Sequence, residues 1–193
     1  MAETPSTMLA LGTQMPAFRL PDPSGKWVSS NDFKDAPGFL VAFISNHCPY
    51  VKHIRSHFAL LAREYQAKGV AIVGINSNDV KEYPEDSPKM MAKEIQTMDY
   101  SFPYLYDETQ EAAKDYRAAC TPDFYLFDGE RRLVYRGQMD ESRPGNNRPV
   151  TGADLRAALD ALLAGKPVSS EQKPSVGCNI KWKPGNEPNY FRK

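Results

Sequence analysis

Apolar residues along the chain fall into runs that predict alternating strands and helices. Residues 38–45 form a continuous apolar run, which is typical of a buried central strand, and residues 70–76 form a second one. Between them, residues 49–68 repeat apolar side chains at helical spacing, with proline at the first position and Gly69 as the stop. That apolar face comprises Val51, Ile54, Phe58, Leu61 and Tyr65. Strand, helix and strand in this order predict a right-handed parallel unit.

The flanking segments predict the rest of a mixed sheet. Residues 15–29 suggest two short strands around a Pro/Gly turn, and residues 123–136 suggest a β-hairpin. We therefore expect an α/β fold in which a mixed central sheet is flanked by helices and preceded by a β-hairpin extension. We expect one domain spanning residues 1–193, in which residues 166–193 form an extended, proline-punctuated C-terminal tail.

Three further helices are expected outside the strand–helix–strand unit. One covers about residues 88–98 with Ser87 as its cap, and a short one covers about residues 109–118. The last helix is expected to begin at Thr151. Asp154 lies three residues later, and the two residues together resemble a capping box. These helices supply the layers that cover the predicted sheet.

The positive and negative charges of the chain are balanced. Lysine plus arginine number 24 and aspartate plus glutamate number 24, which argues against nucleic-acid partners and against anionic membranes. Residues 1–16 lack the basic start and apolar stretch of a signal peptide, and no apolar run reaches membrane-spanning length. We therefore expect a cytoplasmic location, where thiols stay mostly reduced.

Three cysteines are present, namely Cys48, Cys120 and Cys178, which is an odd and sparse set for a disulfide framework. Free cysteine is often a simple core residue, and this interpretation is favoured for Cys120 alone. Cys48 differs because it lies where a buried strand passes into a helix. Unpaired N–H groups and the helix dipole at that position stabilise a thiolate and lower the thiol pKa.

The neighbours of Cys48 strengthen its candidacy as a reactive thiolate. Lys52, His53 and Arg55 add positive or potentially positive groups in the first turns of the predicted helix. Ser45 lies three residues earlier and places a hydroxyl where it can donate to the sulfur. Cys48 and Ser45 are therefore the predicted catalytic residues.

One stretch of the chain resembles a known active-site loop. Residues 43–54 read Phe-Ile-Ser-Asn-His-Cys-Pro-Tyr-Val-Lys-His-Ile. They resemble the active-site loop of the thioredoxin-like alkyl hydroperoxide reductase/thiol-specific antioxidant (redoxin) superfamily, in the branch with an Asn-His-Cys-Pro-Tyr-Val-Lys motif. Further matching segments are 73–79, 102–110, 121–128 and 177–187. Together they extend from about Leu11 to the C-terminus, so the resemblance covers nearly the whole chain.

The resemblance implies a thioredoxin fold and a substrate groove. In such proteins a cis-proline packs against the active-site loop and helps to bind extended substrate backbone. Thr121 and Pro122 stand at this position, so their peptide bond is expected to be cis. His47 and Pro49 flank Cys48 and are assigned to the same groove. The resemblance implies no organic cofactor.

The chain also departs from both related patterns. Dithiol relatives often read Cys-x-x-Cys, whereas this chain has Ser45-x-x-Cys48. Peroxiredoxins use Thr/Ser-x-x-Cys but add an upstream proline and a later arginine, and here Val41 and Pro122 stand at those places. The leading interpretation is a thiol–disulfide oxidoreductase. The alternative is a peroxiredoxin-like peroxidase that reduces hydroperoxides, and the third is a redox-silent binding protein with a thioredoxin fold.

The expected partners follow from thiol chemistry. They are protein or small-molecule thiols and disulfides, with hydroperoxides added in the peroxidase interpretation and thioredoxin or glutathione as the candidate reductant. Cys48 either acts alone or uses a distant resolving thiol. Cys120 lies two residues before Pro122, and Cys178 lies in a tail that can fold back over the site, so both are candidate resolving thiols.

A metal site is the rival within the same loop, because His47, His53 and His57 all lie near Cys48. His53 projects well away from the predicted apolar stripe, and His57 only flanks it. No second cysteine pair or nearby carboxylate completes a ligand set in the sequence. We therefore assign no metal to the site.

Overall fold

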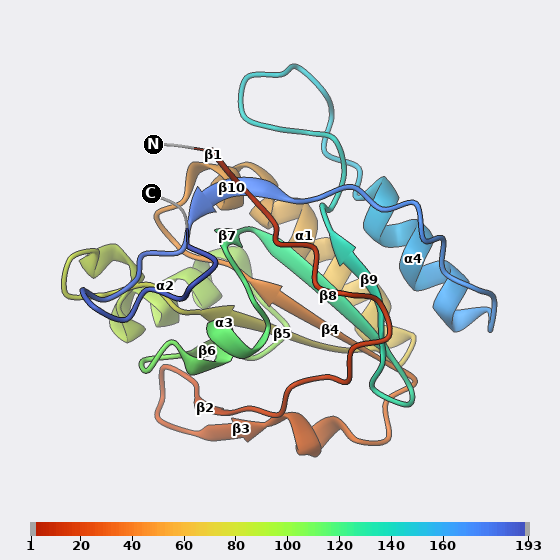
Figure 1. The fold of residues 1–193 in the computed structure, drawn as a ribbon, viewed down its shortest axis with the longest axis horizontal. Coiled ribbons are helices and arrows are strands. Elements are labelled where there is room, and N and C mark those ends of the chain that lie inside the picture. The colour runs from red at the N-terminus through yellow and green to blue at the C-terminus, as the bar shows by residue number, and fades with distance from the viewer. Residues whose placement is uncertain (1–2, 192–193) are drawn as a thin grey trace.

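A five-stranded sheet in the order β6–β5–β4–β8–β9 forms the centre of the computed structural model, which describes residues 3–191 (Figure 1). Its strands are β4 (Gly38–Phe43), β5 (Ala71–Asn76), β6 (Tyr104–Tyr106), β8 (Asp123–Asp128) and β9 (Leu133–Gly137). Strands β4, β5 and β6 are parallel, whereas β8 runs antiparallel to both β4 and β9. The predicted mixed α/β sheet is confirmed.

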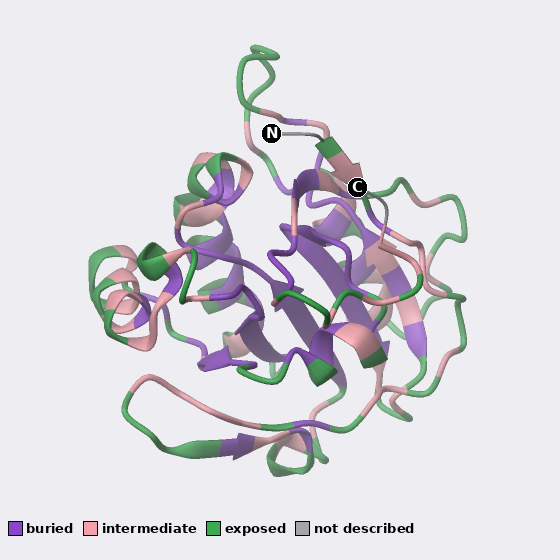
Figure 2. Ribbon diagram, turned by 60° about the vertical axis from the view of Figure 1, so that its left-hand side comes forward, coloured by how far each residue is buried: buried purple, intermediate pink, exposed green. Residues whose placement is uncertain are grey.

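Four α-helices and two short 3-10 helices surround this sheet. They are α1 (Pro49–Ala67), α2 (Pro88–Met98), α3 (Glu111–Asp115), α4 (Ala153–Leu163), η1 (Ser30–Phe33) and η2 (Pro84–Asp86). Helices α1, α2 and α4 pack on one face. Helix α3, the hairpin of β2 (Arg19–Pro21) and β3 (Trp27–Ser29), and part of the tail pack on the other. Figure 2 shows the sheet buried between these layers.

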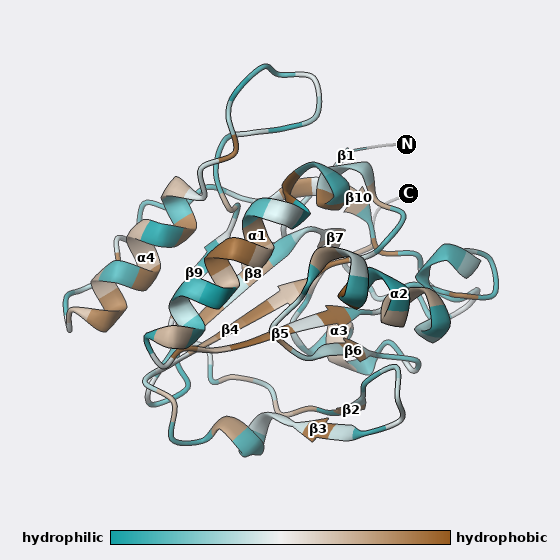
Figure 3. Ribbon diagram, turned by 180° about the vertical axis from the view of Figure 1, so that it is seen from behind, coloured by the Kyte–Doolittle hydropathy of each residue, from teal (hydrophilic) through white to brown (hydrophobic). Residues whose placement is uncertain are grey.

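Strand β4 lies at the centre because both of its faces are apolar. Leu40 and Ala42 point into the core beneath α1, whereas Phe39, Val41 and Phe43 point to the opposite core. Every residue of β4 is buried, and each large side chain stabilises the fold by about 1.5–3 kcal/mol. In Figure 3 β4 and β5 are drawn largely in apolar colours, whereas the helices alternate between hydrophilic and hydrophobic segments. This central strand carries the chain directly to the loop that contains Cys48.

A second, small sheet joins the two ends of the chain. It has the order β1–β10–β7 and consists of β1 (Glu3–Pro5), β10 (Val176–Asn179) and β7 (Cys120–Thr121), all antiparallel. Figure 1 shows β1 and β10 side by side above α1 and β8. Gly177 permits the pairing with β7, because a Cβ atom there would lie 2.0 Å from the Thr121 carbonyl oxygen. The tail is therefore bound against the residues that precede Pro122.

Several boundaries differ from the sequence predictions. The helix expected at residues 109–118 is shorter, because Gln110 and Arg117 adopt left-handed backbone angles at its two ends (φ 65° and 51°). Ser87 is the N-cap of α2, but its side chain makes no capping hydrogen bond. No helix among residues 3–191 is long and apolar enough to cross a membrane.

The capping box expected at Thr151 and Asp154 is wrong. The N-cap of α4 is Gly152, which has left-handed backbone angles and no side chain to cap the helix. The Thr151 hydroxyl accepts the first helical N–H, that of Ala153, at 3.2 Å. The Asp140 carboxylate fixes the turn before the helix by accepting the N–H groups of Thr151 at 2.7 Å and of Gly152 at 2.6 Å.

Candidate active site

Cys48 is the N-cap residue of α1, directly after the loop that leaves β4. Its side chain is fully buried, and when protonated its thiol donates to the backbone oxygen of Thr121 at 3.2 Å. The sulfur makes no regular capping hydrogen bond, although the Val51 N–H in the first turn of α1 acts on it and lowers its pKa. The strand-to-helix position predicted for Cys48 is thus observed.

The pKa of Cys48 is lowered to about 6. The largest cause is a hydrogen bond from the side chain of Cys178, which outweighs the opposing effect of burial, and the Thr121 side chain contributes a further hydrogen bond. The same contact raises the pKa of Cys178 well above the ordinary cysteine value, with burial adding to this effect. Cys48 is therefore the thiolate of the pair and Cys178 is the protonated donor.

The pairing of β10 with β7 explains why Cys178, and not Cys120, reaches Cys48. Cys178 is the cross-strand partner of Thr121, so both side chains lie on the same face of the small sheet. Cys120 is the next residue along β7 and faces the opposite way, with its sulfur 3.9 Å from the Pro122 backbone oxygen. Burial raises the pKa of Cys120 well above its ordinary value. Of the two predicted resolving thiols, the structure brings only Cys178 to Cys48.

Ser45 acts on the site through Thr121. Its buried hydroxyl lies 3.3 Å from the Thr121 hydroxyl, and either oxygen can donate. The groups that lower the Cys48 pKa most are Cys178, Thr121 and backbone N–H groups, so the expected direct donation from Ser45 is corrected. The Thr121–Pro122 peptide bond is cis, and Pro122 and Tyr50 are among the residues that line a small cavity.

A buried carboxylate fixes the loop in front of Cys48. Asp86 accepts the backbone N–H groups of Asn46 at 2.7 Å and of His47 at 3.1 Å, and His47 Nδ1 lies 2.5 Å from its second oxygen. Burial raises the pKa of Asp86, but hydrogen bonds from His47 and Asn78 outweigh this effect and leave the pKa below its ordinary value. Sequence analysis did not identify Asp86, whose only signal is its place in a proline-flanked turn.

Two of the three cationic residues expected to activate Cys48, Arg55 and His53, bind other side chains. Arg55 forms an ion pair with Glu94 of α2 at 2.7 Å, and His53 Nε2 lies 2.7 Å from the Ser142 hydroxyl. His47 stacks on Tyr83 with ring centroids 5.0 Å apart. Among residues 3–191, no three His, Cys, Asp or Glu side chains are grouped to bind a metal ion.

The N-terminal strand closes over the thiol pair. Glu3 is the cross-strand partner of Cys178, and its carboxylate accepts a hydrogen bond from the Tyr50 hydroxyl in the first turn of α1. This hydrogen bond, together with burial and the charge of Glu3, raises the Tyr50 pKa to about 12. Pro49 occupies the first position of α1 and is exposed beside the site. The thiol pair is therefore covered by β1 and β10.

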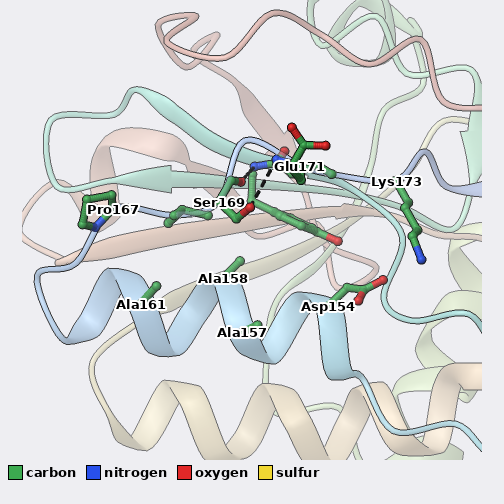
Figure 4. Close-up of a pocket in the computed structure, with 11 residues that line it drawn as sticks. Asp154, Ala157, Ala158, Ala161, Pro167, Ser169, Glu171 and Lys173 are labelled. Atoms are coloured by element: carbon green, nitrogen blue, oxygen red, sulfur yellow. Dashed lines mark hydrogen bonds between the residues drawn. The ribbon is translucent and has the colours of Figure 1, made fainter.

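A separate pocket of about 290 Å³ lies between α4 and the start of the tail (Figure 4). Its floor is the alanine face of α4, formed by Ala157, Ala158 and Ala161, and residues 167–173 form much of its rim. None of the predicted site residues lines this pocket.

Comparison with solved structures reveals two close matches of full length. A hypothetical protein from Sinorhizobium meliloti 1021 is 53% identical, with a TM-score of 0.93, over 94% of this chain and 100% of that one. An uncharacterized conserved protein from Geobacillus kaustophilus is 55% identical, with a TM-score of 0.94, over 96% and 98% of the two chains. These similarities support the fold along almost the whole chain.

A more distant match relates the fold to thioredoxin. The thioredoxin domain of a thiol-disulfide oxidoreductase from Bacteroides vulgatus is 24% identical, with a TM-score of 0.56, over 70% of this chain and 90% of that one. The expected thioredoxin fold is confirmed. No curated protein matches the chain. The AhpC/TSA family model matches residues 11–136, well over half of the sequence, and the chain therefore belongs to the AhpC/TSA family.

Proposed function

We propose that this protein is a thiol–disulfide oxidoreductase in which Cys48 is the attacking thiolate. The observation that carries the proposal is the lowered pKa of Cys48, about 6, at the start of α1 and beside Thr121. A thiol with this pKa is about 90% ionised at pH 7, and the thiolate is the form that attacks sulfur. An inert core cysteine has the opposite property, as the raised pKa of Cys120 illustrates.

The proposed reaction needs only the groups of this site and a disulfide substrate. Cys48 attacks one sulfur of the substrate, forms a mixed disulfide and releases the other substrate sulfur as a thiolate. The Thr121 hydroxyl, which contacts the Ser45 hydroxyl, donates a hydrogen bond to the attacking sulfur. Pro122, His47 and Pro49 border the path by which the substrate reaches that sulfur. We propose protein or small-molecule disulfides as substrates, with thioredoxin or glutathione as reductant in a reducing, cytoplasmic setting.

Hydroperoxide reduction is the second candidate function, because Ser45 stands three residues before a low-pKa Cys48 as in peroxiredoxins. A hydroperoxide would oxidise the thiolate to a sulfenic acid. The groups that lower the Cys48 pKa most are a thiol, a hydroxyl and backbone N–H groups, and no arginine is among them. This donor set supports disulfide exchange over peroxide cleavage.

The test is turnover of a model protein disulfide with dithiothreitol as the electron source, compared in parallel with turnover of hydrogen peroxide. We expect the wild type to accelerate disulfide reduction, Cys48→Ser to abolish the acceleration, and Cys120→Ser to retain it. Faster peroxide turnover than disulfide turnover would favour the second candidate. Absence of both activities would leave a redox-silent binding protein.

A further inference from the structure

The tail strand β10 occupies the edge of β7 that leads into Pro122. It pairs there through Cys178 with Thr121 and through Asn179 with Cys120. We propose that Cys178 is the resolving thiol of the enzyme and that it forms a reversible disulfide with Cys48 of the same chain. The proposal rests on the proposed function and adds to it a second redox residue and a class of substrate.

The first argument is the contact between the two sulfurs. The side chain of Cys178 hydrogen-bonds to Cys48, and the backbone N–H of Cys178 also acts on the Cys48 sulfur. Two sulfurs in hydrogen-bond contact need only a small movement to reach bonding distance. Cys178 is 3% exposed and Cys48 is 0% exposed, so both thiols are shielded from solvent.

The second argument is that the pairing of β10 with its neighbouring strands positions Cys178 next to Cys48. Gly177 lets β10 approach β7 so closely that any side chain there would collide with the Thr121 carbonyl oxygen. The resulting register places Cys178 and Thr121 on one face, towards Cys48. Glu3 of β1 pairs with Cys178 on the other side and anchors Tyr50 of α1. Residues distant in sequence thus combine to hold one thiol against the other.

The third argument concerns the substrate. An extended peptide can bind at the β7 edge only if β10 leaves it, since the backbone groups of that edge are already paired. While Cys178 is displaced, the Thr121 hydroxyl and the Val51 N–H remain to stabilise the Cys48 thiolate. The pairing itself covers only two residues of β7 and three of β1, and the flanking hydrogen bonds of the Ile180 N–H to Ala119 and of the Ser6 N–H to Ser175 must open with it. We therefore assign a disulfide within an extended polypeptide segment as the substrate. When β10 returns to β7, it brings Cys178 onto the Cys48 sulfur.

The reaction balances with this substrate as the oxidant. Cys48 as thiolate breaks the substrate S–S bond, forms a mixed disulfide and releases one substrate thiolate, which takes up a proton. Cys178 then loses its proton and attacks the Cys48 sulfur, so that the Cys48–Cys178 bond forms and the second substrate thiolate leaves. Overall the substrate disulfide gains two electrons and two protons, and the two cysteines lose them.

The decisive experiment equilibrates the full chain with a mixture of reduced and oxidised glutathione, quenches it with acid, and alkylates the remaining thiols. We expect free thiols to fall from three to one, and peptide mapping to identify a Cys48–Cys178 disulfide within a monomer. The Cys120→Ser variant is the matched control and should form the same bond. A disulfide that includes Cys120, a bond between two chains, or retention of three thiols would overturn the inference.

A kinetic measurement supplements the mapping. In Cys178→Ser, the mixed disulfide between Cys48 and a peptide disulfide should persist. In the wild type it should resolve at least about tenfold faster at about 0.1 mM external thiol, because an internal thiol acts at millimolar effective concentration. Equal resolution rates in the two proteins would overturn the role of Cys178 and leave the proposed function intact. Failure of Cys48 to form any mixed disulfide would overturn the proposed function itself.

Discussion

Replacement of Cys178 by alanine should raise the pKa of Cys48 substantially. The hydrogen bond from Cys178 is the largest cause of the lowered Cys48 pKa, and alanine cannot donate. Serine at the same position retains a hydroxyl donor of similar size. The pair Cys178→Ala and Cys178→Ser therefore separates the loss of a donor from the loss of the sulfur atom.

The magnitude follows from the strength of the hydrogen bond. A hydrogen bond to a charged group contributes about 1.5–3 kcal/mol, and one pKa unit corresponds to about 1.4 kcal/mol. Loss of the donor should therefore move the Cys48 pKa from about 6 upward by roughly one to two units. The thiolate fraction at pH 7 then falls from about 90% to between roughly 50% and 10%.

The assay is the rate of Cys48 alkylation by iodoacetamide between pH 4 and pH 10, measured in a Cys120→Ser background. A lowered thiol pKa increases reactivity on the acid side, so the ratio of wild-type to alanine-variant rates should be largest below pH 6. The ratio should approach one above about pH 9, where both thiols are ionised. The serine variant should keep its midpoint close to that of the wild type.

Two results would refute this reasoning. An unchanged midpoint in Cys178→Ala would mean that the helix terminus and Thr121 alone set the pKa. Equal upward shifts in the alanine and serine variants would mean that the sulfur of Cys178, and not its donor capacity, is responsible. Circular dichroism of each variant checks that α1 remains intact.

Three further changes test the supports of the site. Gly177→Ala should displace β10 and slow Cys48–Cys178 disulfide formation, measured by thiol counting, whereas Gly129→Ala, which meets only ordinary contacts, should not. Asp86→Asn removes the charged acceptor of the loop before α1 and should lower the free energy of unfolding by about 2 kcal/mol in urea titration; a change below about 0.5 kcal/mol would contradict its role. Ser45→Cys should form a reversible disulfide with Cys48 and increase dithiol-driven disulfide reduction, measured by turnover, and no gain would count against a thioredoxin-like groove.

The strand–helix–strand unit and the place of Cys48 were predictable because they depend on local pattern. The apolar run of β4 and the 3.6-residue period of α1 meet at Cys48 in the sequence itself. A cysteine at that junction implies a stabilised thiolate by general electrostatics, whatever the rest of the fold. The direction of its pKa shift was therefore accessible, although its main cause was not.

The sequence named Cys178 and Thr121 as candidates near Cys48, but it could not choose Cys178 over Cys120, because that choice depends on the strand register between distant parts of the chain. Cys178 lies far along the sequence from Thr121, and β10 is too short to show any periodic pattern. The only local signal is Gly177, whose missing side chain permits the close approach. Asp86 lies in a polar, proline-flanked turn, whose sequence is typical of a solvent-exposed loop. Its burial depends on the backbone and side-chain groups that donate hydrogen bonds to it. The effect of the nearby cations was overestimated because the ion pair of Arg55 and the hydrogen bond of His53 are not visible in the sequence.

The most direct test of the central claim is the pH dependence of disulfide exchange at Cys48. A single-turnover reaction of reduced protein with a chromogenic aromatic disulfide, in the Cys120→Ser background, reports release of the first aromatic thiolate. The account predicts a rate that rises through a midpoint near pH 6, reaches a plateau by about pH 8 and disappears in Cys48→Ser. A rate that still rises through pH 8.5, or one that survives the loss of Cys48, would contradict it.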